Sequence, residues 1–388
     1  MKRLLSIALA LIMLFSIAGC SQGSTPTPST NDSSVGSTPA SSDDSATPVA
    51  MGGRTIGLNY FGSGSYVLGV LRNNSEVVIK ACGDEPLALD NNFNLEQIIT
   101  DVESMLQSGV DGIIFWSPIQ SQMLKVAEMC KDAKVPFVFN DKVPTDPEIL
   151  AQLATNPYYA GAIAPDNISY GKAAAEYAIE QGWKTCIISG PEVGDATDQP
   201  RIDQFTEMFT AAGGQILTTL YQSSTEAKAK LEDALVTYGE VDFIYGSGSD
   251  FGIAAVQALK SHPEWKTKVI TGGLDESVID MLSDESSPMA MTVGDYWVCG
   301  QFAAMILENY LNGTPLKDAD GKPFYFAEVP PFFVSADKVQ QFKDTFIKQN
   351  CYSNEEIKAL SSTTYDKFLE AVLSFSFSER AKARGVDF

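Results

Sequence analysis

The sequence predicts an α/β protein built on two doubly wound parallel sheets. From Arg54 onward, short β-rich runs bounded by Gly, Asp or Pro alternate with longer runs of helical periodicity. This alternation is typical of a parallel sheet with helices on both faces. Some predicted strands, such as residues 113–116 (IIFW) and 243–246 (FIYG), are apolar at consecutive positions, as expected when both faces of a strand are buried.

The predicted strands and helices follow from these patterns along the chain. Ten strands are predicted, at residues 55–60, 77–82, 112–116, 136–140, 160–164, 185–189, 215–221, 241–245, 268–271 and 290–293. Helical periodicity in the intervening runs predicts helices at residues 95–107, 120–131, 169–181, 201–212, 226–238 and 251–260. The length of 388 residues also favours two domains, because one hydrophobic core rarely serves so long a chain.

The first twenty residues have the pattern of a secretory signal. Lys2 and Arg3 are followed by a mostly apolar run at residues 4–17, which is too short for a transmembrane span. Residues 17–20 (IAGC) resemble the lipobox of bacterial lipoproteins, which implies cleavage before Cys20 and diacylation of its thiol. Two acyl chains are enough for stable anchoring. We therefore expect an extracytoplasmic protein, lipid-anchored to the outer face of the cell membrane.

Residues 21–53 are predicted to form a disordered tether. The run 21–50 is dominated by Ser, Thr, Pro, Asp and Gly, and it contains the segment 25–30 (TPTPST). Such a composition buries too little apolar surface to offset the entropy lost on ordering. The tether would let the folded body move about 30 Å from its lipid.

Charge and histidine content exclude several functions. The chain has 27 Lys and Arg against 49 Asp and Glu, a formal net charge of −22, which repels phosphate backbones and anionic lipids. Nucleic acid is therefore not an expected partner. The single histidine, His262, lies in a predicted loop, and a Ser/His/Asp site or a typical zinc site would depend on it alone. We predict no catalytic residue and no metal site.

The five cysteines after Cys20 are predicted to be buried, unpaired thiols. They are Cys82, Cys130, Cys186, Cys299 and Cys351. Their number is odd, no two form a CxxC pair, and all but Cys351 lie within or beside apolar segments. These features favour small buried hydrophobic residues over a redox or metal site.

Two further motifs look like cofactor or ion sites but are incomplete. Residues 246–252 (GSGSDFG) follow a predicted strand as a dinucleotide-binding loop would, but the third glycine is one residue late. Asp250 would also place a negative charge where a pyrophosphate should bind. Residues 318–321 (DADG) look like the start of a calcium loop, but no Glu follows at the required spacing. No cofactor is predicted.

Polar and aromatic residues follow many of the predicted strands. In doubly wound sheets, ligands bind beyond the carboxyl ends of the strands. The candidates at these ends are Asn59, Tyr60, Trp116, Ser117, Asp141, Lys142, Asp166, Asn167, Ser249, Asp250, Asp275, Asp295 and Tyr296. The alternative for any one of them is that it caps the next helix. As a set, their carboxylates, amides and rings are groups that bind the hydroxyls and C–H faces of a sugar.

Several ordered motifs resemble the periplasmic sugar-binding proteins of type I fold, which feed ABC importers and some receptors. The resemblance runs from residue 54 to about residue 335. Residues 95–99 (LEQII) and 108–114 (SGVDGII) are similar to the family's second helix and third strand. Residues 135–142 (VPFVFNDK) resemble a strand that ends in Asp-Arg, and residues 164–167 (APDN) resemble the crossover into the second lobe.

The resemblance implies a set of ligand-binding residues. Asp141 matches an aspartate that holds sugar hydroxyls, while Lys142 stands in place of the usual arginine and lacks its bidentate fork. Asp250 and Asp275 match aspartates of the second lobe, and Asp295 stands where the family has a glutamine. The implied site is Tyr60, Phe61, Trp116, Asp141, Lys142, Asn167, Arg201, Asp250, Asp275 and Asp295, with Tyr66 and Trp297 as further stacking candidates.

The resemblance also implies how the chain is organised. The chain is expected to cross between two lobes near Ala162, Tyr296 and Ala327, so that the crossings form a three-strand hinge. The predicted lobes are residues 54–162 with 296–327, and residues 163–295 with 328–388, the last segment including a C-terminal extension. A ligand that bridges the lobes would stabilise the closed form.

These features predict a lipid-tethered monomer that binds a monosaccharide and delivers it to an ABC permease in the membrane, without enzymatic activity. The alternatives that keep the fold are a nucleoside, a quorum-signal furanose or an amine as ligand, or a chemoreceptor as partner. A glycosidase is a further alternative, because strand-end aspartates can supply its two carboxylates. Against it, Arg201 and Lys142 would hold those aspartates ionised.

Overall fold

The computed structural model describes residues 52–62, 64–195 and 197–388. The predicted leader, the lipidation site Cys20 and most of the tether lie outside these residues. Among the described residues, no helix is both long and apolar enough to cross a lipid bilayer.

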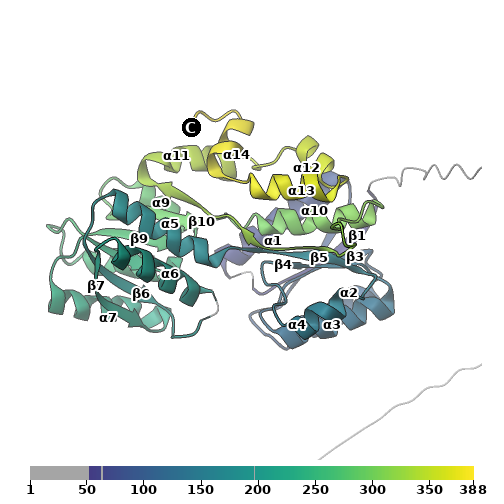
Figure 1. Ribbon diagram of the computed structural model, residues 1–388, viewed down its shortest axis with the longest axis horizontal. Helices are drawn as coiled ribbons and strands as arrows, with labels where there is room; N and C mark the ends of the chain where they lie inside the picture. The colour runs from purple at the N-terminus through teal and green to yellow at the C-terminus, as the bar shows by residue number, and fades with distance from the viewer. Residues whose placement is uncertain (1–51, 63, 196) are drawn as a thin grey trace, which may run out of the picture. The chain divides into compact units, whose positions relative to one another are not determined.

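Two six-stranded sheets form the centre of the described chain (Figure 1). Sheet A has the order β11-β5-β4-β3-β1-β2, with strands β1 (Thr55–Tyr60), β2 (Glu85–Asp90), β3 (Gly112–Phe115), β4 (Phe137–Asn140), β5 (Tyr159–Pro165) and β11 (Phe324–Val329). Sheet B has the order β12-β10-β9-β8-β6-β7, with strands β6 (Thr185–Gly190), β7 (Gln215–Tyr221), β8 (Phe243–Gly246), β9 (Lys268–Gly272), β10 (Met289–Gly294) and β12 (Phe332–Ser335). The strand pairs are parallel except for β10 with β12. The predicted class of two doubly wound sheets is therefore confirmed.

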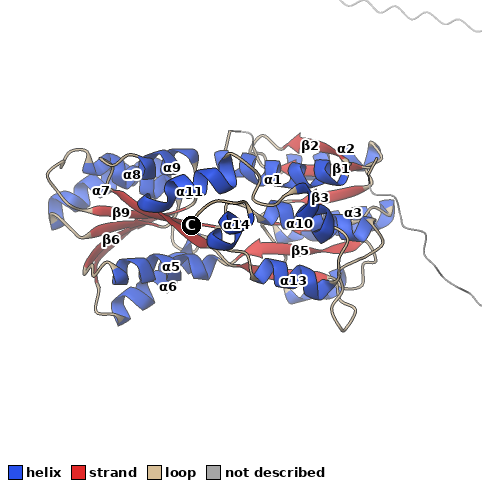
Figure 2. Ribbon diagram, turned by 90° about the horizontal axis from the view of Figure 1, so that it is seen from above, coloured by secondary structure: helices blue, strands red, loops and turns tan. Residues whose placement is uncertain are grey.

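Helices cover both faces of each sheet. On sheet A, the helices α1 (Tyr66–Cys82) and α10 (Cys299–Leu311) pack on one face and α2 (Gln97–Gln107), α3 (Gln120–Ala133) and α4 (Pro147–Leu153) on the other (Figure 1). On sheet B, the helices α7 (Ser224–Tyr238), α8 (Ser249–Leu259) and α9 (Glu276–Ser283) pack on one face and α5 (Asn167–Glu180) and α6 (Asp198–Ala211) on the other (Figure 2). Consecutive apolar residues such as Ile113, Ile114 and Phe115 are buried, because both faces of their strands are covered.

The predicted strand at residues 77–82 is wrong, since this segment is the end of helix α1. Val77 and Val78 suggest a strand, but Leu71, Val78 and Cys82 are buried on one face of the helix. Gly83 then ends the helix with a φ of 88°, a left-handed conformation that glycine adopts without strain. The strand of this region is β2, which was not predicted because Pro86 interrupts its pattern. Strand β2 lies at the edge of sheet A, where a proline is tolerated.

The chain passes between the two sheets three times, after β5, after β10 and after β11. Each sheet, with the helices that cover it, forms one lobe. We call the part around sheet A the N-terminal lobe and the part around sheet B the C-terminal lobe. The residue numbers at which we divided the lobes remain a prediction.

The C-terminal extension contacts both lobes. It contains η1 (Ala336–Lys338), α11 (Val339–Phe342), the π-helical segment η2 (Lys343–Ile347), α12 (Asn354–Leu360), α13 (Tyr365–Leu373) and α14 (Phe377–Ala383). Helix α12 packs on α1 and α10, and α13 packs on β11, whereas α14 packs on α11 and η2. Our grouping of all residues 328–388 with the C-terminal lobe does not describe α12 and α13. Aromatic rings explain the place of α13, because its Phe368 contacts Phe302 of α10 and Phe324 of β11.

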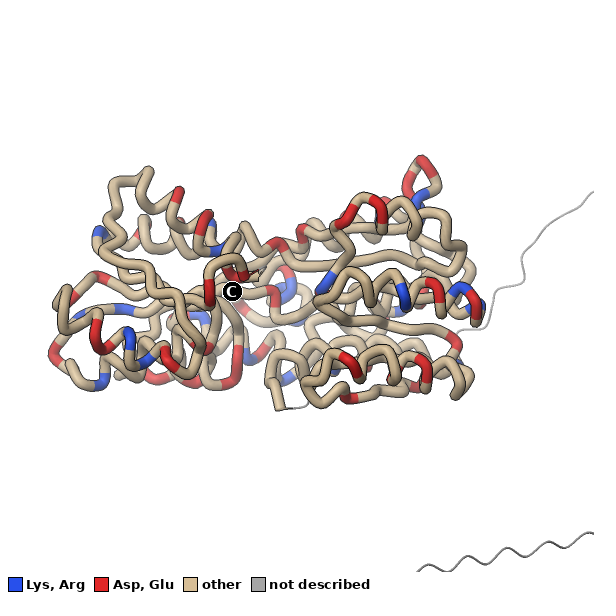
Figure 3. The backbone as a smooth tube through the Cα atoms, turned by 90° about the horizontal axis from the view of Figure 1, so that it is seen from below, with Lys and Arg blue, Asp and Glu red and all other residues tan. Residues whose placement is uncertain are grey.

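The five cysteines of the described chain are free and buried, which confirms the prediction. No group of three or more His, Cys, Asp or Glu among the described residues is placed to hold a metal ion. The acidic residues are spread over both lobes (Figure 3).

Candidate functional site

A cavity of about 280 Å³, which we call the first cavity, lies at the carboxyl ends of strands from both sheets. Trp116 and Asp141 reach it from the ends of β3 and β4 in sheet A. Asn167 and Arg201 reach it from α5 and α6, and Asp295 directly follows β10. The topology of two doubly wound sheets thus brings these residues together where ligands bind in such folds.

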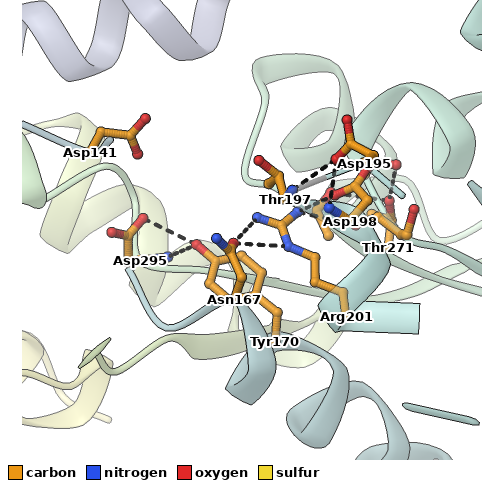
Figure 4. A network of polar contacts seen from close by, with 12 residues as sticks. Asp141, Asn167, Tyr170, Asp195, Thr197, Asp198, Arg201, Thr271 and Asp295 are labelled. Atoms are coloured by element: carbon orange, nitrogen blue, oxygen red, sulfur yellow. Dashed lines mark hydrogen bonds and ion pairs between the residues drawn. The ribbon is translucent and has the colours of Figure 1, made fainter. Parts of the chain in front are cut away.

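Arg201 forms the centre of a buried network on the side of the C-terminal lobe (Figure 4). Its side chain is almost fully buried, with 9% of its surface exposed. Nη2 and Nε donate to Oδ1 of Asn167 at 2.8 and 3.2 Å, and Nη1 donates to Oδ1 of Asp198 at 3.0 Å. Nη1 also donates to the carbonyl of Ser247, and the guanidinium lies 4.1 Å from the ring centre of Tyr170. These contacts fix the orientation of the guanidinium before any ligand binds.

The N-terminus of α6 is built to hold Asp198 beside Arg201. Asp195 Oδ1 accepts hydrogen bonds from the backbone N–H groups of Thr197 and Asp198 at 2.9 and 2.8 Å. Burial raises the pKa of Asp198, although the neighbouring Arg201 acts against this rise. The carboxyl group is thus held in the cavity wall by its own helix terminus.

Asp295 is the most buried acid of the first cavity, with 2% of its surface exposed. Oδ1 accepts from the backbone N–H of Trp297 at 2.8 Å and from the hydroxyl of Tyr170 at 3.3 Å (Figure 4). Oδ2 accepts from the thiol of Cys299 at 3.3 Å. Burial is the main cause of the raised pKa of Asp295, and the nearby Asp141 adds to it.

The backbone after Asp295 has an unusual conformation. Tyr296 and Trp297 have φ angles of 50° and 52°, in the left-handed region that bulky residues rarely adopt. The bond from the Trp297 N–H to the Asp295 carboxylate closes this turn. The strained turn lies where the chain leaves sheet B for α10, and it presents Trp297 to the first cavity.

Trp116 and Asp141 form the opposite wall, in the N-terminal lobe. Buried Asn59 fixes the Trp116 backbone, accepting from its N–H at 2.9 Å and donating to its carbonyl at 2.7 Å. The Trp116 indole N–H donates to Oδ2 of Asp141 at 3.0 Å. Asp141 has a φ of 65°, which Asp tolerates better than most residues. The ring and the carboxylate are thus held side by side.

Lys142 connects the two walls. Its ammonium lies 3.5 Å from Oδ2 of Asp141 and donates to Oγ1 of Thr197 in the C-terminal lobe at 3.3 Å. A polar bond therefore crosses between the lobes. The side chain of Lys142 is shorter than that of arginine and ends in a single ammonium. It therefore cannot form the two parallel hydrogen bonds that a guanidinium forms.

Two of the predicted aspartates line a different cavity. Asp250 and Asp275 lie in an adjoining cavity of about 580 Å³, which we call the second cavity. Asp250 is exposed, and the buried Oδ1 of Asp275 has no hydrogen-bond partner in the part of the chain that the structure describes. Burial raises the pKa of Asp275. The predicted site is thus divided between two neighbouring cavities.

The aromatic residues after β1 lie outside the first cavity. The guanidinium of Arg72 lies over the ring of Tyr60, and its Cζ is 4.9 Å from the centre of that ring. Phe61 stacks on Trp116, with ring centres 5.2 Å apart, and so supports a ring that does line the cavity. Neither residue is among those that line the first cavity.

Sequence reasoning missed Tyr170 and Asp198, which both line the first cavity. Both have a signal in the sequence, because each lies three residues from a predicted site residue on the same helix: Tyr170 follows Asn167, and Asp198 precedes Arg201. Residues three apart share a helix face.

The charges of the first cavity nearly balance. Its lining contains three carboxyl groups, those of Asp141, Asp198 and Asp295, and two cations, Lys142 and Arg201. Burial raises the pKa of Asp198 and of Asp295, and a raised pKa reduces the negative charge that these two carboxyl groups carry. An uncharged polar ligand matches such a wall better than a strongly charged one.

Solved structures and a family profile place the chain among known proteins. A search of curated protein sequences found no match. Among solved structures, a periplasmic ribose ABC transporter protein from Conexibacter woesei superposes with a TM-score of 0.62 at 15% identity, covering 76% of this chain and 96% of that one. A solute-binding protein from Actinobacillus succinogenes with bound D-allose gives 0.61 at 16% identity, covering 74% and 99%.

A third similar structure is the 5-methylthioribose transporter solute-binding protein from Thermotoga lettingae, in complex with 5-methylthioribose. It superposes with a TM-score of 0.60 at 16% identity and covers 87% of this chain and 98% of that one. At such identities the likeness concerns the fold. The sequence profile of a periplasmic binding protein domain matches residues 60–315, well over half of the chain, and the protein therefore belongs to the periplasmic binding protein domain family.

Proposed function

We propose that this protein is the extracytoplasmic solute-binding component of an ABC importer and that its ligand is a monosaccharide bound in the first cavity. The observation that carries the proposal is the composition of that cavity. Trp116 and Trp297 offer ring faces, Asp141 and Asp198 offer acceptors, and Arg201 offers oriented donors. A sugar ring needs these three kinds of partner at once.

The physical match is specific to a neutral, hydroxyl-rich ring. Carboxylates accept from sugar hydroxyls in charge-assisted hydrogen bonds, which are stronger than neutral ones. Indole faces pack on the C–H faces of the ring and bury apolar surface. The nearly balanced charge of the wall adds no strong preference for an ion.

The similar structures support this choice of ligand class. Those described above are named as ribose, D-allose and 5-methylthioribose binding or transport proteins. Their ligands are single sugar units, and the first cavity of about 280 Å³ is near the lower end of ordinary small-molecule sites.

The proposed mechanism is closure of two lobes around the ligand. The first cavity takes residues from both lobes, and the chain crosses between the sheets three times. A sugar that contacts both walls stabilises the closed form by the difference between its contacts in the closed and open states. The closed lobes would then be recognised by a membrane permease, and the sugar would be released unchanged.

The membrane anchor is a separate part of the proposal. Cleavage before Cys20 and diacylation of its thiol would hold a monomer at the outer face of the cell membrane through the tether at residues 21–53. In cells, the wild type should incorporate a labelled fatty acid and Cys20→Ser should not. Equal incorporation into the two proteins would contradict the anchor without affecting the binding proposal.

The binding proposal is tested by titration calorimetry with a panel of pentoses, hexoses and inositols. We expect saturable one-to-one binding of at least one of them, and chromatography should recover the ligand unchanged. Conversion of the sugar would favour the glycosidase alternative. Binding of a nucleoside or an amine with no binding of any sugar would contradict the ligand class.

A further inference from the structure

The second cavity adjoins the first. The two cavities share Val67, Asp198, Gly248 and Ser249 as lining residues. The second cavity has a volume of about 580 Å³ against about 280 Å³ for the first. A ligand confined to the first cavity leaves this neighbouring space unfilled.

Aromatic pairs lead from the first cavity into the second along two paths. On one path, Trp116 lines the first cavity, Phe61 stacks on Trp116, and Phe93 contacts Phe61 edge to face at 5.6 Å and lines the second cavity. On the other, Trp297 lines the first cavity and Tyr66, at 6.4 Å in an edge-to-face contact, lines the second. Ring faces therefore continue past the space that a single sugar would occupy.

Phe93 is held at this position at a cost in backbone strain. Its φ is 58°, a left-handed conformation that is unfavourable for a bulky residue. Its N–H donates to the carbonyl of Phe61 at 2.6 Å, and 54% of its surface is exposed. A large exposed ring that is held by a strained backbone and lines the second cavity is a candidate contact for a ligand.

The charged residues that line the second cavity are all carboxylates. Asp250, Asp275 and Glu276 line it together with the shared Asp198. The Ser249 side chain forms a hydrogen bond with the Asp275 carboxyl group, but within the described residues the buried Oδ1 of Asp275 has no partner of its own, although buried acceptors are nearly always paired. Of the described residues that line this cavity, none is Lys or Arg. A ligand group that fits here donates hydrogen bonds and carries no negative charge.

We propose that the second cavity is a second sugar subsite, so that the protein also binds disaccharides, whose second ring packs on Phe93 and Tyr66. The hydroxyls of that ring donate to the carboxylates of Asp275 and Glu276. This inference rests on the proposed function, because the first ring occupies the first cavity. Joining the two rings makes the second contact intramolecular, so a disaccharide binds more tightly than its component monosaccharide.

The test compares ligands of two sizes on the intact chain. Calorimetry measures the affinity of each monosaccharide that binds and of disaccharides that carry this monosaccharide, in both anomeric linkages. We expect at least one disaccharide to bind tenfold or more tightly than its monosaccharide. If a monosaccharide binds and no disaccharide binds more tightly, the second subsite is overturned and the proposed function stands. If neither class binds, the proposed function itself fails.

Two substitutions of exposed residues test whether the second cavity causes the tighter binding of a disaccharide. Phe93→Ala and Glu276→Gln should each weaken disaccharide binding about fivefold, as expected for one lost ring contact or one lost charge-assisted hydrogen bond, with less than twofold change for the monosaccharide. Phe333→Ala on β12 and Glu285→Gln are matched controls, because they replace an exposed ring and a remote acid that do not line this cavity. Unchanged disaccharide affinity in both Phe93→Ala and Glu276→Gln would contradict the subsite.

Discussion

The two walls of the first cavity are built in different ways. The C-terminal lobe contributes a connected polar network in which Arg201 bonds to Asn167 and Asp198. The N-terminal lobe contributes Trp116, whose position depends on backbone bonds to Asn59. Hydrogen bonds between polar side chains thus hold the wall of the C-terminal lobe in place, whereas backbone hydrogen bonds fix the ring that forms the wall of the N-terminal lobe. The difference suggests that the polar wall orients the ligand and the aromatic wall covers it when the lobes close.

The largest expected effect is on the polar wall. Arg201→Met removes the donor that Asp198 and Asn167 share, and it leaves Asp198 buried without its cation. Truncating a buried, hydrogen-bonded charge costs about 2 to 5 kcal/mol of binding energy, which is at least a thirtyfold loss of affinity. Calorimetry with the best sugar of the panel checks this. An affinity within threefold of the wild type would remove Arg201 from the site.

A matched control exists in the N-terminal lobe. Arg54 is likewise a partly buried arginine with acidic partners, at 2.7 Å from Asp84 and 2.7 Å from Glu308, but it does not line either cavity between the lobes. Arg54→Met should lower the unfolding temperature and leave sugar affinity unchanged. If Arg54→Met and Arg201→Met weakened binding equally, loss of folding would explain both results.

The next largest effect is expected on the aromatic wall. Trp116→Ala removes a ring face, and the expected loss of affinity is about tenfold, from about 1.5 kcal/mol of ring contact. Trp116→Phe should recover most of it, because the ring face remains. Trp265→Ala is the control, since Trp265 stacks on His262 away from the first cavity. Equal affinities for the Trp116→Ala and wild-type proteins would contradict the role of the ring.

A smaller effect is expected at the contact between the walls. Lys142 donates to Thr197 at 3.3 Å and has a partly exposed ammonium, and exposed ionic contacts contribute little. Lys142→Met should therefore change sugar affinity by less than about threefold. A loss of a hundredfold would show that Lys142 replaces the arginine of the related proteins as a direct ligand contact.

The smallest effect on binding is expected at Glu308, where stability should depend on pH instead. Burial raises the pKa of Glu308 from 4.5 to about 8, and Asp84 adds to this rise while Arg54 opposes it. The folded state therefore holds this proton more tightly than the unfolded state, so stability falls as the pH rises from 4.5 to about 8. Thermal unfolding of the wild type and Glu308→Gln across this range should show the wild type losing stability relative to the variant. A constant difference would contradict the raised pKa.

The fold could be predicted from the sequence where the local signals agree with the packing. Most strands of both sheets are apolar and β-rich, so their positions were predicted closely. The segment 77–82 was not, because its β-branched residues fit a helix face that packs on α10. Strand β2 was missed because Pro86 weakens its pattern, and only its place at the sheet edge permits it.

The candidate site could be predicted in part, for a similar reason. Strand ends indicate which side chains gather at one end of a sheet, so Trp116 and Asp141 were found, whereas Arg201, which lies in helix α6, was found only through the family resemblance. The sequence does not show how side chains turn, so Tyr60 was included although its ring lies against Arg72. The division of the site into two cavities depends on the approach of two lobes, which no local pattern encodes.

The most direct test of the central claim is calorimetric titration of the wild-type protein and Arg201→Met with the sugar panel. The account predicts that the wild type binds at least one monosaccharide at a single site and that Arg201→Met loses at least thirtyfold in affinity while remaining folded. Absence of binding to every sugar, or equal affinity in the two proteins, would contradict it.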